Sequence, residues 1–275
     1  MATTMIEGIT LKRRSPTLEA LRDIFQGMAK WRLWSALAWQ QLRQRYRRTW
    51  IGIGWIGVSF AMFMVAKIFV FGGLMGKSMD YYAGHLTLGY LIFRLISNAV
   101  TGSSSVFVSA RTWISSEPLP LSVYVYQLMT NNFIIFAITA IPAAAICVWS
   151  GSYHIEGLIW LVPCLLVYAV CTICVGLFLG VISARYRDVM HFSATVMQIA
   201  YFLTPVIWVM PEEGARATAA YINPFTHFIA ILREPIMDGT APVDSWQIVL
   251  GCTGALMVLA VLFFATSRRK IIFWL

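Results

Sequence analysis

The sequence predicts an all-α polytopic membrane protein, and three observations lead to this prediction. Of its 275 residues, 59% are hydrophobic and 12% are charged, whereas a typical globular domain has about 25% charged residues. The apolar residues form runs near the length that spans a bilayer, about 20 residues in a helix. Lys and Arg residues gather in the segments between alternate runs. These features argue against a soluble enzyme, a nucleic-acid-binding domain and a disulfide-rich scaffold.

Six segments are predicted to be transmembrane helices. They are residues 50–73, 85–104, 121–149, 157–183, 190–210 and 246–266. The third segment is long, and Pro142 is expected to kink it or to end it early. Residues 1–49 form a separate N-terminal segment, and residues 50–275 form one transmembrane domain. Because the number of spans is even, both ends of the chain lie on the same side of the membrane.

Charge decides which side this is, because Lys and Arg are enriched on the cytoplasmic side. If both ends are cytoplasmic, 16 of the 21 Lys and Arg residues lie inside and three lie outside. The remaining two, Lys67 and Arg94, fall within predicted spans. Both termini are therefore predicted to be cytoplasmic. The Cys171–Cys174 pair is interpreted as helix packing, and no metal site is expected.

Residues 17–48 are predicted to form one amphipathic helix in the membrane interface. Its apolar positions recur at three- and four-residue spacing: Trp31, Trp34, Ala38 and Leu42. Tryptophans on one face and arginines on the other are typical of an interfacial helix. A basic run with Arg43, Arg45 and Arg47 then leads into the first span. This run either holds the span to anionic lipids or docks a cytoplasmic partner, and the residues alone leave both open.

Two further cytoplasmic segments are short and polar. Residues 109–120 carry Arg111, Trp113 and Glu117, and the prolines at their end limit any helix to one or two turns. Residues 185–188 are compressed between two spans. This loop either transmits the motion of a partner to the helices that it joins or is an ordinary positive-inside loop.

The sequence shows no catalytic, nucleotide-binding or cofactor site. Residues 72–78 resemble a phosphate-binding P-loop, but three residues instead of four separate the glycines, and no strand precedes them. The chain is therefore not expected to hydrolyse ATP. Because no Asp or Glu falls within a predicted span, a proton- or sodium-coupled transporter is less favoured.

Two kinds of residue in the spans are candidates for a substrate pathway. Lys67 and Arg94 are candidates because a cation in hydrocarbon costs a few kcal/mol, although Lys67 could instead extend to the outer headgroups. Aromatic residues gather near the outer mouth: Tyr81, Tyr82, Tyr90, Phe93, Tyr201 and Trp208. They form either an ordinary interfacial belt or flat surfaces for sugar rings.

Residues 211–244, between the fifth and sixth spans, are predicted to form a re-entrant or interfacial helical hairpin. Asn223 and Pro224 begin its apolar helix, and Phe225 and Phe228 lie on one face. The segment is too apolar for a free loop and too short for a span, and irregular backbone at depth needs protein or water beside it. It either gates a pore or only packs as a lid.

The whole arrangement resembles the permease subunits of ABC type-2 exporters of cell-surface polysaccharide, in particular the O-antigen (Wzm-like) branch. The stretches that carry the resemblance are Arg45–Gly52 with Trp55, Ser183–Asp188, Phe202–Trp208, Asn223–His227, Arg233–Pro235 and Arg269–Leu275. The capsule and teichoic-acid branches share much of this pattern, so the identity of the polysaccharide stays open.

The resemblance implies a homodimer in a bacterial inner membrane, joined to two separate ATPase subunits that bind ATP and Mg²⁺. The ATPase would dock at Arg43, Arg45, Arg47, Arg111, Glu117, Arg185, Arg187 and Asp188. A lipid-linked polysaccharide would pass a channel lined by Lys67, Tyr81, Tyr82, Tyr90, Phe93, Arg94, Tyr201 and Trp208. An outer gate would comprise Asn223, Pro224, Phe225, Phe228 and Arg233. The alternatives are a type-2 permease for a drug or small lipid and, in another class, a membrane-embedded glycolipid enzyme.

Overall fold

The computed structural model describes residues 15–73, 78–211 and 213–275, and in these ranges it is helical throughout, with no strand. The all-α prediction is therefore confirmed. Residues 1–14 of the N-terminal segment and most of the rejected P-loop-like stretch, with Gly76 and Lys77, lie outside the described residues.

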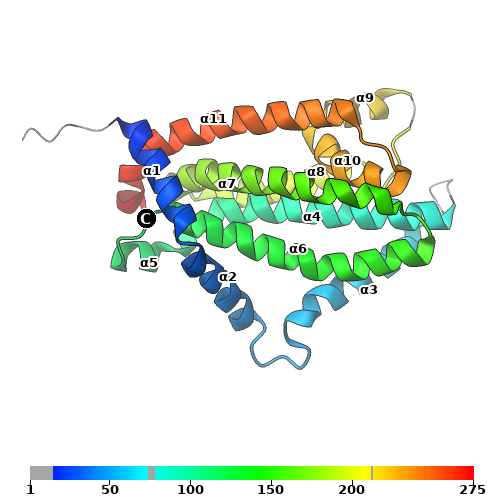
Figure 1. The fold of residues 1–275 in the computed structure, drawn as a ribbon, viewed down its shortest axis with the longest axis horizontal. Coiled ribbons are helices and arrows are strands. Elements are labelled where there is room, and N and C mark those ends of the chain that lie inside the picture. The colour runs from blue at the N-terminus through cyan, green and yellow to red at the C-terminus, as the bar shows by residue number, and fades with distance from the viewer. Residues whose placement is uncertain (1–14, 74–77, 212) are drawn as a thin grey trace, which may run out of the picture.

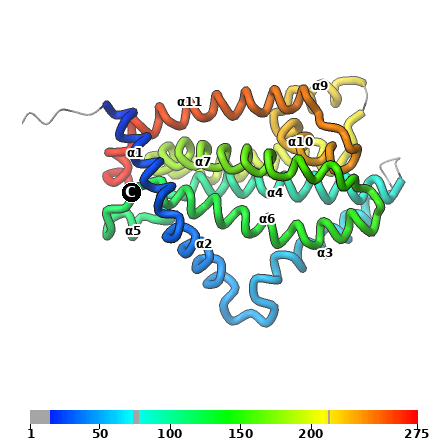
Figure 2. Tube along the Cα trace, in the orientation of Figure 1, coloured from blue at the N-terminus to red at the C-terminus, as the bar shows by residue number. Residues whose placement is uncertain are grey.

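Five helical segments in the described part of the chain are long and apolar enough to cross a membrane. Their α-helices are α3 (Trp55–Phe71), α4 (Met79–Ser109), α6 (Ser122–Ser150), α7 (Leu161–Arg185) and α11 (Val243–Trp274). The helix α4 packs against both α6 and α7, and α7 also packs against α11 (Figures 1 and 2). The chain is therefore an integral membrane protein, and five of its predicted spans are confirmed as helices.

The predicted fifth span, residues 190–210, is only partly helical. Its helix α8 (Asp188–Leu203) has 16 residues and ends where Thr204 takes an extended conformation, with ψ at 139°. Pro205 explains this end, because a proline disfavours the helical conformation of the residue before it. The count of six spans therefore stays a prediction.

One of the two alternatives for Pro142 is excluded, because α6 continues through it to Ser150, and a kink there stays a prediction. One expectation about helix boundaries is wrong. Residues 17–48 do not form one helix, because α1 (Pro16–Ala29) and α2 (Trp31–Arg45) are separated at Lys30. The helix α1 lies so close to the start of α6 that a Cβ on Gly27 would clash with Ser122.

The shorter elements lie at the two ends of the bundle. The helix α5 (Arg111–Ser116) is confirmed as a helix of one to two turns, and a tight turn joins α7 to α8. At the opposite end lie η2 (Ile155–Trp160), α9 (Ala215–Ile222) and α10 (Pro224–Asp238), while η1 (Gly52–Gly54) precedes α3. We call the end with α1, α5 and the C-terminus the basic end, and the end with α9 and α10 the hairpin end (Figure 1).

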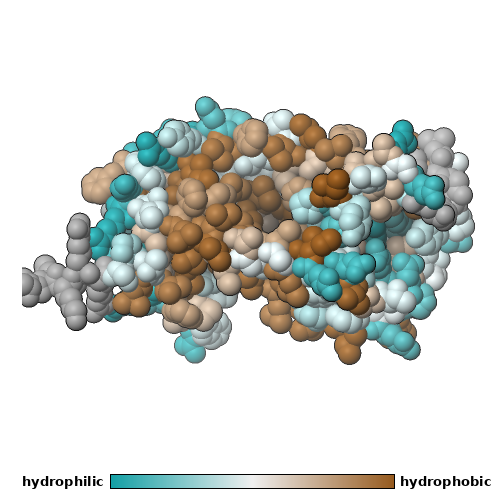
Figure 3. All heavy atoms as spheres, turned by 90° about the horizontal axis from the view of Figure 1, so that it is seen from above, coloured by the Kyte–Doolittle hydropathy of each residue, from teal (hydrophilic) through white to brown (hydrophobic). Residues whose placement is uncertain are grey.

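The surface is consistent with a bundle in a bilayer. Apolar side chains cover much of the middle of the face seen in Figure 3, and hydrophilic ones gather toward the two ends. Large apolar side chains of α3 and α8 remain exposed in the protomer, among them Phe69 and Phe202. Lipid or another protein must cover these side chains, because water would not solvate them favourably.

Candidate functional site

The predicted ATPase-docking residues lie on α2, α5, α7 and the first turn of α8, or in the short connections that follow α2, α5 and α7. All eight side chains are exposed: Arg43, Arg45, Arg47, Arg111, Glu117, Arg185, Arg187 and Asp188. The guanidinium carbon of Arg185 lies 5.5 Å from the ring centroid of Trp274, so the turn between α7 and α8 contacts the end of α11. The geometry leaves these side chains accessible to a partner, and docking itself stays a prediction.

Sequence analysis missed the residue that holds the basic end together, Asp23. Its carboxylate is 1% exposed and accepts hydrogen bonds from the backbone N–H groups of Leu121 (3.3 Å) and Ser122 (3.0 Å). Arg268 of α11 donates to the same carboxylate at 2.9 Å. Asp23 therefore caps the start of α6 and ties α1 to α11. Its place between Ala20 and Gly27 on one helical face was the signal available in the sequence.

The structure brings three of the predicted channel residues into one cluster. The ammonium of Lys67 lies 4.3 Å and 4.5 Å from the ring centroids of Tyr90 and Tyr201, and 4.2 Å from that of Phe63. It also contacts the hydroxyl of Tyr201. Aromatic faces attract a cation in this range, so the cluster stabilises the Lys67 charge where it lies.

Among the other predicted aromatic residues, Tyr82 holds the segment after α8 against α4, Trp208 bonds within that segment, and Phe93 packs against Tyr201. The Tyr82 hydroxyl donates to the carbonyl of Ile207 at 2.8 Å, and the Trp208 indole donates to the carbonyl of Phe202 at 3.0 Å. Tyr82 and Phe93 are buried within the protomer, while Tyr81 is partly exposed and lies beside His85. Whether these rings face a channel stays a prediction.

The predicted gate residues fix α10 in place. Asn223 accepts a hydrogen bond from the N–H of Phe225 at 3.0 Å, which caps α10, and donates to the hydroxyl of Thr204 at 2.9 Å. Pro224 occupies the first turn, where it needs no N–H partner. The carbonyl of Phe228 accepts from the hydroxyl of Tyr168.

Arg233 is the most deeply buried cation of this hairpin, with 7% of its surface exposed. Its Nη1 donates to the carbonyl of Pro205 at 2.7 Å and lies 3.4 Å from Nε2 of His85. It therefore joins α10 to α4 and to the irregular segment after α8. Helix α10 continues past Pro235 to Asp238 and ends at Gly239, whose φ of 72° favours glycine.

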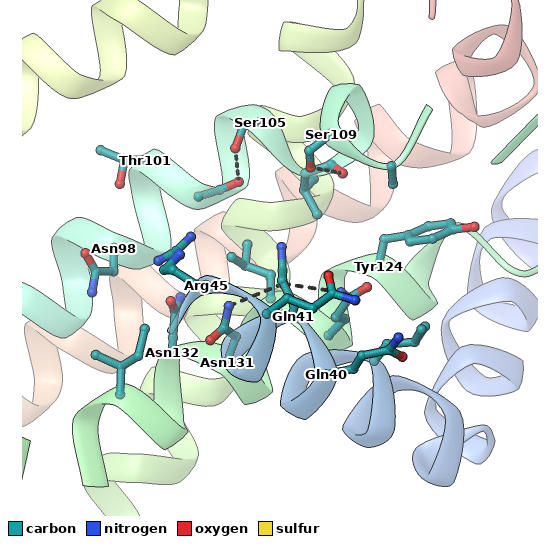
Figure 4. Close-up of a pocket in the computed structure, with 18 of the residues that line it drawn as sticks. Gln40, Gln41, Arg45, Asn98, Thr101, Ser105, Ser109, Tyr124, Asn131 and Asn132 are labelled. Carbon is teal, nitrogen blue, oxygen red and sulfur yellow. Dashed lines mark hydrogen bonds between the residues drawn. The ribbon is translucent and has the colours of Figure 1, made fainter. Parts of the chain in front are cut away.

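A polar cavity of about 600 Å³ lies between α2, α4 and α6, and we call it the amide cleft (Figure 4). Seven amide side chains line it: Gln40, Gln41, Gln44, Asn98, Gln127, Asn131 and Asn132. Arg45, Arg94, Tyr124, Thr101 and Ser105 add two cations and three hydroxyls. No Asp or Glu in the described part of the chain lines the cleft.

Several polar atoms of the amide cleft have no hydrogen-bond partner. The Tyr124 hydroxyl, Asn131 Oδ1 and Asn132 Nδ2 are all buried and unpaired. Gln41 Oε1 instead accepts from Gln127 and Asn131, each at 3.3 Å. A buried unpaired polar group costs about 1–3 kcal/mol, so this grouping indicates a site that water or a ligand completes. The predicted channel residue Arg94 lines this cleft and lies one helical turn after Tyr90 of the Lys67 cluster.

Comparison with known proteins shows the family. Residues 32–237 match the model of the ABC-2 type transporter family. The chain belongs to the ABC-2 type transporter family. The chain is also similar to the O-antigen export system permease protein RfbA of Myxococcus xanthus, with 20% identity over 256 residues. That alignment covers 92% of this chain and 97% of the relative. The resemblance to a Wzm-like permease is thus confirmed.

Membership of this family implies that the chain is a membrane subunit that is not itself catalytic and that works with an ATPase subunit. The matched region begins within α2 and ends within α10. It therefore includes the Lys67 cluster, the amide cleft and nearly all of the hairpin. Sequence analysis missed the cleft, although Gln127, Asn131 and Asn132 form a polar group within a predicted span.

Proposed function

We propose that this chain is the channel-forming permease of an ATP-driven exporter of lipid-linked polysaccharide of the O-antigen type. It would work as a homodimer with two ATPase subunits, in the inner membrane of a bacterium. The observation that carries the proposal is the similarity to an O-antigen export permease over 92% of this chain and 97% of that protein.

The positions of the exposed arginines support docking of an ATPase at the basic end. Exposed arginines of α2, α5 and the turn between α7 and α8 lie in the segments that the sequence predicts to be cytoplasmic. The turn contains only Tyr186 and Arg187 between two helices. Because the turn is so short, a partner that displaces it would also move the adjoining ends of α7 and α8. ATP hydrolysis in the partner would thereby move the bundle, and both termini would be cytoplasmic.

The packing of α10 supports the proposal that the hairpin end forms an outer gate. Helix α10 packs against η2, α4 and α11 and does not cross the bundle, so it closes this end of the protomer. The Lys67 cluster lies on neighbouring parts of α3, α4 and α8. Movement of α8 would change both the cluster and the segment that Arg233 holds.

Deletion of the gene tests the substrate. We expect long-chain polysaccharide to disappear from the cell surface and to accumulate in the cytoplasm, as seen by surface labelling and by gels of whole-cell glycan. A plasmid copy of the natural gene should restore the surface signal. Normal surface polysaccharide together with sensitivity to drugs would instead support a drug or small-lipid permease and would overturn the proposal.

Charge reversal tests the ATPase contact. The Arg185→Glu and Arg187→Glu double variant should lose co-purification of the ATPase, because two charges on the connecting turn become repulsive to an acidic partner surface. Arg216→Glu is the matched control, since Arg216 is also exposed but lies on α9 at the hairpin end. Equal recovery of the ATPase with all three proteins would remove the turn as a docking site.

A further inference from the structure

We propose that the amide cleft binds the sugar-phosphate headgroup of the exporter's lipid-linked substrate. This inference rests on the proposed function and assigns it a binding site inside each protomer. The site lies between α2, α4 and α6 and is distinct from the Lys67 cluster and the outer gate.

The hydrogen-bonding groups of the cleft fit a carbohydrate. An amide side chain offers both a donor and an acceptor, which suits sugar hydroxyls that are themselves both. Asn131, Asn132 and Tyr124 are at least nine-tenths buried, and each has one polar atom without a partner. All three residues line the same cavity, and in Figure 4 Asn131 and Asn132 lie on one side of Gln41 and Tyr124 on the other. A sugar ring would supply the missing partners.

The charge of the cleft fits a phosphate. Arg45 and Arg94 come from different helices and both line the cavity, whereas no carboxylate of the described chain does. Guanidinium groups bind phosphate through paired N–H donors. A neutral sugar alone would leave both charges without a counterion, so the combination of amides and arginines favours a glycosyl phosphate.

The position of the cleft fits a headgroup that is attached to a lipid. Helix α2 exposes Trp31 and Trp39, which are typical of a helix in the membrane interface. The polar lining is bordered by Leu37, Ile56 and Ile135. A polar headgroup would therefore occupy the amides while its lipid chain stays in the apolar surroundings. The exposed indole of Trp113, which also lines the cavity, offers a flat face to a sugar ring.

The test measures binding to the permease–ATPase complex in nanodiscs of phosphatidylcholine, by isothermal titration. The probes are geranyl diphosphate N-acetylglucosamine, geranyl diphosphate and short-chain phosphatidylglycerol. We expect the glycosylated probe to bind about tenfold more tightly than geranyl diphosphate, from one or two added hydrogen bonds. Equal binding of phosphatidylglycerol would show an ordinary lipid site and would overturn the proposal, as would no binding of the glycosylated probe.

Two substitutions of opposite charge locate the site. Gln41→Glu should weaken binding of both diphosphate probes about fivefold, and Gln41→Lys should strengthen it, because one charge is added beside the phosphate. Gln41 is exposed on α2, so both variants should fold. Gln26→Glu and Gln26→Lys make the same charge changes on α1 outside the cleft and should leave binding unchanged. A purely structural role of Gln41 would not give effects of opposite sign.

The Asn131→Leu and Asn132→Leu double variant tests the sugar contacts. It should weaken binding of the glycosylated probe about tenfold or more and weaken binding of geranyl diphosphate less, because the lost hydrogen-bond partners face the sugar. If binding were unchanged in this variant and in both Gln41 variants, the cleft would not be the headgroup site. The proposed exporter function would be unaffected by that result. Normal surface polysaccharide in the deletion strain would overturn the function while leaving the binding result in place.

Discussion

The two ends of the bundle treat their polar groups differently. At the hairpin end Arg233 is buried and bonded to Pro205, and His227 contacts Ser245 at 3.0 Å and the Tyr221 carbonyl at 2.7 Å. Three residues that line the amide cleft, Tyr124, Asn131 and Asn132, each have a buried polar atom without a partner. Thr87, Thr226 and Trp246 also lack partners toward the hairpin end, but of these three only Thr226 lines the cavity of about 300 Å³ at that end.

We interpret this difference as a division of roles, in which the hairpin end closes the bundle and the amide cleft binds a ligand. Polar groups that are already paired, such as those of Arg233 and His227, gain little from a ligand, and their hydrogen bonds hold one conformation. A region with unpaired amides and two arginines gains by binding a polar anion. We therefore expect substitutions at the hairpin end to change stability and substitutions in the cleft to change binding.

The largest effect is expected where η2 meets α10. A Cβ on Gly157 would lie 1.9 Å from the carbonyl oxygen of Pro235, so Gly157→Ala forces two backbones apart. We expect a loss of about 3 kcal/mol in the free energy of unfolding, at the upper end for overpacking. Thermal unfolding of the purified protein measures it.

Gly254→Ala is the control for this close approach. It is also a helical glycine, but nothing lies within 4 Å of its added Cβ. It should be neutral or more stable by about 0.5–1 kcal/mol, because alanine favours the helix. Similar melting temperatures for the two variants would show that η2 and α10 are not tightly packed.

The next largest effect should come from Asp23→Ala at the basic end. The change leaves the N–H groups of Leu121 and Ser122 and the Arg268 guanidinium without their carboxylate. We expect a loss of about 2–3 kcal/mol, the cost of unpaired buried donors. The midpoint of denaturant unfolding measures the loss.

Arg269→Gln serves as the reference for Asp23→Ala. Arg269 pairs with Glu19 at 2.6 Å, but its side chain is 67% exposed. Exposed ion pairs contribute about 0–1 kcal/mol, so this variant should unfold almost as the natural protein does. If Asp23→Ala behaved in the same way, the contact of α1 with α6 and α11 would not stabilise the fold.

Arg233 at the hairpin end and Arg94 in the amide cleft allow a direct comparison of these two regions. Arg233→Ala should destabilise the protein by about 2 kcal/mol, because the Pro205 carbonyl loses a charged donor within a packed region. Arg94→Ala, in the cleft, should change unfolding by less than about 0.5 kcal/mol, since Arg94 is only partly buried. It should instead reduce export. The two melting curves and a surface-polysaccharide assay test this pair, and equal destabilisation would contradict the contrast.

The parts of the fold that follow from local sequence were predictable. Long apolar runs gave five of the spans, and prolines limited the helix between α4 and α6 to α5. Lys67, Tyr90 and Tyr201 were predicted as channel residues from their types and depth, and this role stays a prediction. The cluster itself could not be predicted, because it needs the side-by-side placement of α3, α4 and α8.

Features that depend on packing between distant segments were missed. The contact of Gly27 with Ser122, just before the break at Lys30, joins segments that lie far apart in the sequence. The early end of α8 was indicated by Pro205, but the apolar run after it concealed the signal. The amide cleft was missed because its residues come from three helices, and an isolated Gln or Asn in a span is compatible with simple helix packing.

The smallest effect, opposite in sign, is expected from Asn132→Leu in the cleft. The substitution removes a buried unpaired amide and fills a similar volume with apolar atoms, so it should raise stability by about 1 kcal/mol. Export should fall at the same time, since function is commonly maintained at the expense of stability. Thr139→Val on the same helix removes a buried hydroxyl already bonded to the Ile135 carbonyl and should raise neither quantity. A loss of stability in Asn132→Leu would indicate that the cleft is a structural network and not a prepared binding site.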